Sequence, residues 1–99
     1  MQEQEINNIR KVVTDYGKVK ADVIKQRKEQ RELFEKGQIS YDKMEDRINH
    51  LYKGLEDTQE RKTFVELANK IQHDPEGEKY LRATCMDVFL GIKVDPSKL

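Results

Sequence analysis

The sequence predicts an all-α protein that consists of a long helical hairpin, about residues 3–36 and 41–72, and a C-terminal helix over about residues 75–90. Three observations support this fold class. Apolar residues recur every three or four positions, strong helix-stop and helix-start signals stand back to back at residues 36–41, and no segment is evident as a strand. Ninety-nine residues suffice for one domain. We expect residues 1–92 to form it, with residues 93–99 as a flexible tail.

The first predicted helix has one apolar stripe that ends before the helix does. The stripe begins with Ile6, Ile9, Val13 and Tyr16. Gly17 interrupts it, which indicates either a bend or a close contact with another helix. Between residues 25 and 32 the sequence has no apolar residue over two turns. This part of the helix therefore cannot line a dry core.

The turn after this helix has the clearest local signals in the chain. Gly37 can enter the left-handed conformation that ends many helices, because it has no Cβ to oppose it. Ser40 can accept hydrogen bonds from the free amides of the next helix, and Asp42 suits the positive end of its dipole. The short loop predicts that the two helices fold back on each other as a hairpin.

The second helix contains two apolar groups that one straight helix cannot bury on the same side. At 100° per residue, Leu55 and Phe64 lie about 180° apart. Gly54 and the cap-like residues 57–60 allow a break between them. The alternative is one helix that buries opposite faces at its two ends. Because no proline intervenes, we expect a continuous or mildly kinked helix over residues 41–72.

The third helix begins at a standard signal and is the most apolar element. Asp74 is expected as its N-cap and Pro75 as its first helical residue, where the missing amide of proline costs nothing. It carries apolar or small residues on more than one side: Tyr80, Leu81, Thr84, Cys85, Met86, Val88, Phe89 and Leu90.

Composition favours long amphipathic helices and excludes several protein classes. Charged residues make up 38% of the chain and apolar residues only 35%, so a deep globular core is not expected and self-association is a common way for such chains to complete one. No apolar run reaches the length of a membrane span, and the acidic start is unlike a signal peptide. The single cysteine suits a reducing compartment. We expect a cytoplasmic protein.

Charge is balanced over the whole chain but not along it. From residue 10 to 31 there are eight basic and three acidic residues, whereas residues 42–60 contain six acidic and three basic ones. A basic arm and an acidic arm favour an antiparallel hairpin, in which charge sets pairing and register. The alternative is that the basic arm binds nucleic acid or a nucleotide through the side chains of Lys18, Lys20, Lys25, Arg27, Lys28 and Arg31.

The residues that could carry chemistry are scattered. His50, His73 and Cys85 lack the spacing of a metal site, so neither a metal nor another cofactor is expected. Cys85 lies in an apolar stripe, where cysteine is usually a small core residue. Adjacent acids such as Glu45 and Asp46 point to different sides of a helix. The sequence therefore predicts a protein that is not an enzyme.

Residues 33–53 resemble a known helical module. The run Leu33-Phe34-Glu35-Lys36-Gly37-Gln38-Ile39-Ser40-Tyr41-Asp42-Lys43-Met44, continued by Ile48 and Leu51, is similar to the short C-terminal module called SHOCT. In this sequence the stretch is central, whereas the family module is usually terminal. The resemblance implies a small helical interaction or oligomerisation piece and brings no catalytic residues.

These observations predict a non-enzymatic protein-protein interaction module, either a homo-oligomer or a small adaptor or inhibitor of a larger protein machine, as is common among bacterial and phage accessory proteins. Its expected partners are a second copy of itself, a larger protein, or both. We expect the contact residues on the apolar faces of the last two segments: Phe64, Leu67, Ile71, Tyr80, Leu81, Val88 and Phe89.

Overall fold

The chain folds into four helices. The computed structural model describes residues 2–91, with side chains described up to residue 88. The helices are α1 (Glu3–Glu35), α2 (Tyr41–Glu56), α3 (Gln59–Ile71) and α4 (Pro75–Gly91), and this described part of the chain contains no strand. The prediction of an all-α fold with a long hairpin is confirmed. The tail expected at residues 93–99 lies outside the described residues.

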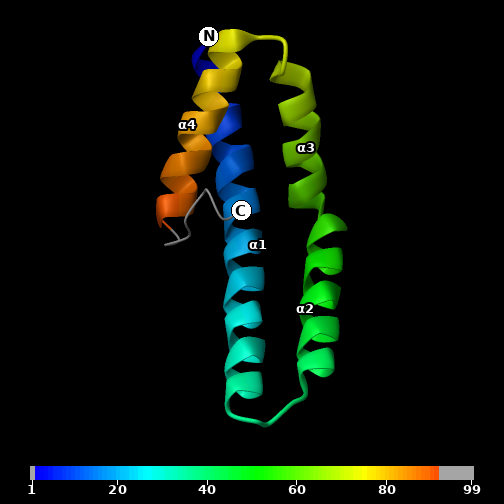
Figure 1. Ribbon diagram of the computed structural model, residues 1–99. Helices are drawn as coiled ribbons and strands as arrows, with labels where there is room; N and C mark the ends of the chain where they lie inside the picture. Colours follow the sequence, from blue (N-terminus) through cyan, green and yellow to red (C-terminus); the bar gives the residue numbers. More distant parts are fainter. Residues whose placement is uncertain (1, 92–99) are drawn as a thin grey trace.

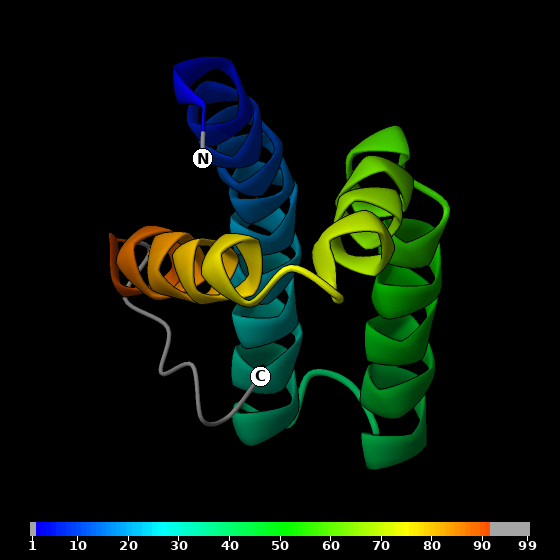
Figure 2. The same ribbon diagram turned by 90° about the horizontal axis from the view of Figure 1, so that it is seen from above.

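Helix α1 runs the length of the molecule and supports the other three. Helices α2 and α3 follow one another along one side of α1, and α4 lies beside its N-terminal half (Figure 1). Seen from above, α4 lies across α1, and α3 lies on the other side of α1 (Figure 2). The molecule measures 53 × 23 × 18 Å. Its radius of gyration is 15.9 Å, against about 13 Å for a compact domain of this length.

The turn between α1 and α2 has the predicted geometry. Gly37 has a φ of 73°, and its amide donates to the carbonyl of Phe34 while the amide of Gln38 donates to that of Leu33. These two bonds form the Schellman pattern that satisfies the last carbonyls of a helix. The Ser40 hydroxyl accepts from the amide of Lys43 at 3.2 Å, as expected for an N-cap.

The expectation of a continuous or mildly kinked helix over residues 41–72 is wrong. The chain leaves the helical conformation at Thr58, whose φ and ψ are −71° and 148°. The Thr58 hydroxyl donates to the carbonyl of Leu55 at 2.7 Å and accepts from the amide of Arg61 at 3.3 Å. One side chain therefore satisfies groups on both sides of the break, which makes a proline unnecessary.

This break lets two apolar groups face α1 that a straight helix would separate. Leu55 is buried with Tyr16 and Val23 of α1. Phe64 also reaches Tyr16, with ring centroids 4.7 Å apart and planes tilted by 33°. Leu55 near the end of α2 and Phe64 of α3 therefore both pack against Tyr16 of α1.

The buried core lies at one end of the molecule, which we call the head and which consists of residues 2–24 with α3 and α4. Its centre is Ile9, Val13 and Leu81, and Val13 has no exposed surface. Side chains from α3 and α4 pack around this centre: Phe64, Leu67, Ala68, Ile71, Tyr80, Cys85 and Val88. Each fully buried aliphatic side chain stabilises the fold by about 1.5–3 kcal/mol.

Candidate functional site

The outer part of the hairpin, beyond Ile24 and Leu55, has no buried residue. We call residues 25–54 the distal hairpin; every one of them is either half-exposed or exposed. Two helices in contact cover only one side of each other, so their apolar stripes stay open at both edges. The distal hairpin is therefore the largest part of the chain without a core of its own.

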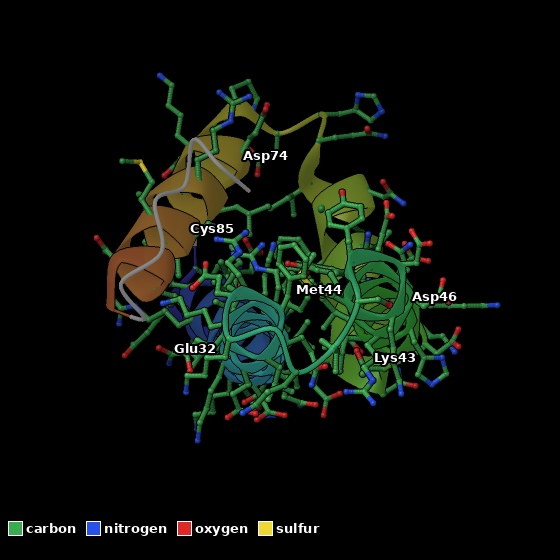
Figure 3. All side chains as sticks on the ribbon, turned by 60° about the horizontal axis from the view of Figure 1, so that its bottom comes forward. Glu32, Lys43, Met44, Asp46, Asp74 and Cys85 are labelled. Carbon is green, nitrogen blue, oxygen red and sulfur yellow. The ribbon has the colours of Figure 1, made fainter. Side chains whose placement is uncertain are left out.

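The distal hairpin nevertheless carries a line of apolar side chains. Helix α2 contributes Met44, Ile48 and Leu51, all half-exposed. Figure 3 shows Met44 between α1 and α2, whereas Glu32 and Asp46 lie on the outer sides of these helices. We call the following set the apolar stripe of the distal hairpin: Leu33, Phe34, Ile39, Tyr41, Met44, Ile48 and Leu51.

Two aromatic rings at the tip are the most exposed part of this stripe. Phe34 is 37% exposed and Tyr41 is 55% exposed, although their rings are in edge-to-face contact with centroids 5.7 Å apart. Aromatic side chains with this exposure are frequent anchors at protein interfaces. The tip can therefore contribute contact area without any rearrangement of the backbone.

Helix α1 faces this stripe with polar side chains. The guanidinium of Arg27 donates to the Tyr52 hydroxyl at 2.8 Å, and Arg47 donates to the side-chain oxygen of Gln30 at 3.1 Å. The Nε atom of Arg27 is buried without a hydrogen-bond partner. Because these contacts are polar, α1 covers the apolar side chains of α2 only in part.

The charges of the distal hairpin are not paired across it. Among the described residues, no salt bridge joins residues 25–36 to residues 41–56. Lys11 forms a salt bridge with Asp15, and Arg82 forms one with Glu78; each lies within one helix. The sequence predicts that charge pairing sets the register of the hairpin, but no salt bridge between its two described arms does so. Packing and two polar contacts hold the helices together.

The residues expected to contact a partner lie mainly in the head core. Leu81 is buried, and Phe64, Leu67, Ile71, Tyr80 and Val88 pack against the cluster that contains it. The side chain of Phe89 lies outside the described residues. Packing within one chain accounts for the apolar character of these residues. Their contact with a partner stays a prediction. Met86, 53% exposed, is the large apolar residue that α4 turns to solvent within the described part.

The six basic residues proposed for nucleic acid do not share one surface role. Lys18, Lys25, Lys28 and Arg31 are exposed. The other two are engaged in the fold: Arg27 contacts Tyr52, and the Lys20 ammonium lies 5.5 Å from the centre of the Tyr16 ring. Four of the six therefore remain available to a ligand.

A shallow groove runs between α1 and α3 in the head. Its central part has a volume of about 540 Å³ and is lined by Asn8, Val12, Thr63, Glu66, Leu67, Asn69 and Lys70. It continues towards Asp15 and Gln59 at one end and towards Glu5 and Asp74 at the other. Its rim carries both signs of charge, so it selects no charged ligand by electrostatics alone.

For the described side chains, two kinds of chemical site are relevant, an activated thiol and a metal site. Burial raises the pKa of the half-buried Cys85 thiol, and the nearby Lys20 opposes that rise only in part. A raised pKa makes a thiol a weaker nucleophile at neutral pH. No group of three or more His, Cys, Asp or Glu side chains within the described residues is placed to hold a metal ion.

The sequence pointed to the apolar faces of residues 64–89 and did not single out the apolar stripe of the distal hairpin. The signal that could have found it is the absence of apolar residues from 25 to 32. Because residues 25–32 of one arm are polar, they cannot bury the apolar stripe of the other arm completely.

Two further findings concern membrane-spanning helices and similarity to known proteins. Within residues 2–91, no helix combines the length and apolar character needed to cross a membrane. No family model matches this sequence, and neither a curated protein nor a solved structure matches it.

Proposed function

We propose that this chain is a non-enzymatic protein-protein interaction module that binds a helical surface through its distal hairpin. The observation that supports this proposal is a hairpin of thirty residues with a continuous apolar stripe and no buried residue. Apolar side chains left half-exposed along a helix pair are the usual contact surface of another helix. The resemblance of residues 33–53 to the SHOCT module agrees with a helical interaction piece.

The exposed area of the chain supports the same proposal. The accessible surface is 7236 Å², whereas a compact monomer of this mass exposes about 5,900 Å². A stable protein interface covers about 800 Å² on each partner. A surface of this size is ample for one such interface.

The setting that we propose is the cytoplasm, with a larger protein or a second copy of the chain as partner. A lone, half-buried cysteine is compatible with a reducing compartment. A protein that blocks or bridges a larger machine needs only a stable surface and no catalytic group. Small size and a preformed helical shaft suit an adaptor or inhibitor of this kind.

A pull-down from the source cell tests the proposed function. The tagged chain is compared with Ile48→Lys, which places a charge in the apolar stripe, and with Asn49→Lys, which adds the same charge at an exposed neighbour. We expect the wild type and Asn49→Lys to bind the same protein, or a second copy, and Ile48→Lys to lose it. Equal binding by all three chains contradicts the proposal.

A second candidate function, binding of nucleic acid or a nucleotide, is favoured by one observation. Lys18, Lys25, Lys28 and Arg31 are all exposed on α1, and none forms a salt bridge with a described residue. Phosphate contacts of this kind give affinity that falls steeply with salt. A salt-sensitive gel shift that is lost when these four residues become Glu supports this candidate, and a shift that the four changes leave intact excludes it.

A further inference from the structure

We infer that the surface bound to the distal hairpin is the distal hairpin of a second copy of this chain, so that two copies form an antiparallel four-helix bundle. This inference rests on the proposed function and specifies its partner. In the bundle each α1 lies beside the partner's α2 as well as its own. The contact is two-fold symmetric, as in most soluble homodimers.

Burial is the first argument for a second copy. In a two-helix hairpin every apolar side chain has an open edge, and the structure shows this along all of residues 25–54. A four-helix bundle encloses such side chains because each helix then has two neighbours. A partner hairpin matches the stripe in length and in spacing, since it is the same stripe. Ile48 and Leu51, half-exposed in one chain, become core residues of the bundle.

Charge is the second argument. Residues 25–36 hold five basic and three acidic side chains, and residues 41–57 hold five acidic and three basic ones. The first arm has a net charge of +2, the second has −2, and their sum is zero. Two hairpins therefore approach without net repulsion. Pairing each α1 with the partner's α2 places opposite charges together, whereas pairing like arms opposes equal charges.

The third argument is that these charges are still available. Lys28 and Arg31 on α1, and Glu45 and Glu56 on α2, are exposed and lie at the flanks of their helices. Within the described part of the chain, no salt bridge links residues 25–36 to residues 41–56. The sequence predicts that the basic and acidic arms pair within one hairpin. The same opposite charges can instead pair between two chains. Such contacts select the partner and its orientation.

A charge-exchange experiment tests this inference directly. One chain carries Lys28→Glu and Arg31→Glu, so that both of its arms are acidic. A second chain carries Glu45→Lys and Glu56→Lys, two acids on the same flank of α2, so that both of its arms are basic. Each chain alone would bring like charges together at both contacts of a homodimer. In the mixed dimer, every α1 meets a partner α2 of opposite charge.

Sedimentation equilibrium at matched micromolar concentrations gives the readout. We expect the wild type to be a dimer, each exchanged chain alone to dimerise at least about tenfold more weakly, and an equimolar mixture to recover the dimer. Circular dichroism confirms that each chain is helical. The exchanged residues form no salt bridge across the hairpin within the described part of the chain, so the exchanges break none of the salt bridges seen there.

The results that overturn the inference differ from those that overturn the proposed function. A monomeric wild type, a different oligomer, or a mixture no more dimeric than its components overturns the second-copy assignment. If the wild type is monomeric but captures another protein in an Ile48-dependent way, the interaction module stands and only its partner changes. If neither self-association nor capture depends on Ile48, both fail.

Discussion

Val88 of α4 packs directly onto the backbone of α1 at Gly17. A Cβ atom placed on Gly17 would overlap the Cγ1 atom of Val88. The lack of a side chain at position 17 thus allows the two helices to approach at their crossing. The sequence left a bend or a close contact as alternatives for this glycine, and the structure shows the close contact.

We therefore expect Gly17→Ala to destabilise the protein. Alanine gains about 1 kcal/mol in helix propensity, but the overlap with Val88 costs about 1–3 kcal/mol, so the sum is a loss or is close to zero. Urea unfolding measures it. Adding Val88→Ala removes the overlapping methyl groups, so Gly17→Ala should be less harmful in that background than alone.

The matched control is Gly54→Ala in α2. A Cβ at Gly54 meets no atom within 4 Å, and this glycine is exposed. We expect a stabilisation of about 0.5–1 kcal/mol from reduced backbone freedom. If Gly17→Ala and Gly54→Ala stabilise equally, the contact between Gly17 and Val88 does not limit the approach of α4.

Gly37 tests the turn between α1 and α2. Its φ of 73° lies in the left-handed region, although a Cβ atom placed on this glycine would meet no atom within 4 Å. The cost of Gly37→Ala is therefore conformational, about 1–2 kcal/mol, and not steric. Gly37→Asn should lose less, because asparagine tolerates this conformation better. Equal losses for the two variants in thermal unfolding would contradict this explanation.

Thr58 tests the break between α2 and α3. We expect Thr58→Ala to destabilise the protein by about 1 kcal/mol, because the amide of Arg61 loses its acceptor. Thr58→Ser keeps the hydroxyl and should retain most of this stability. The control is Thr63→Ala, the same chemical change inside α3, which removes no cap and breaks one exposed hydrogen bond, from the side-chain amide of Gln59. A similar loss at positions 58 and 63 would show that capping does not fix the break.

The parts of the fold that follow from local chemistry were predictable, and the parts that depend on distant packing were not. Gly37 and Ser40 indicate a turn through their own conformations and hydrogen bonds. Local signals could not decide the break at Thr58, because the same residues fit a cap and a helix interior. Its outcome depends on Leu55 and Phe64 both reaching Tyr16, a contact between segments about forty residues apart.

The candidate site shows the same division. The sequence identified apolar faces around Leu67 and Tyr80 but could not show that α1 covers them through Ile9 and Val13. Ile48 shows the opposite, because it lies within the predicted hairpin and yet α1 covers it only in part. Periodicity states which side of a helix is apolar, whereas the packing of the whole chain decides how much of that side is buried.

Cys85 gives a pH-dependent prediction. Burial disfavours its thiolate, so its pKa in the folded state lies above the ordinary value of 9.0. As the pH rises, the unfolded chain loses this proton first. The contribution to stability is complete below the unfolded-state pKa and is lost as the pH rises through the folded-state value.

We therefore expect the free energy of unfolding of the wild type to fall above about pH 9, and to fall less in Cys85→Ala. The comparison between the two chains isolates the contribution of the thiol. Alkylation of Cys85 by iodoacetamide at about pH 7.5 should be slow in the folded protein and fast in urea. Equal rates in both conditions would show that the thiol is not protected.

The hydrogen bond between Arg27 and Tyr52 provides the last prediction. The Tyr52 hydroxyl accepts from the half-buried guanidinium of Arg27, whose Nε atom has no partner. Tyr52→Phe therefore leaves a second donor of this guanidinium unsatisfied, and we expect a loss of about 1 kcal/mol. Arg27→Met keeps the apolar stem and removes the poorly satisfied charge, so it should leave stability unchanged or raise it.

A double-mutant cycle in urea, at one fixed protein concentration, measures the coupling between these two residues. Tyr52→Phe should cost less in the Arg27→Met chain than in the wild type, since no guanidinium is then left without its acceptor. If Tyr52→Phe costs the same in both chains, the two side chains act independently. In that case shape and apolar contact, and not this hydrogen bond, position α2 on α1.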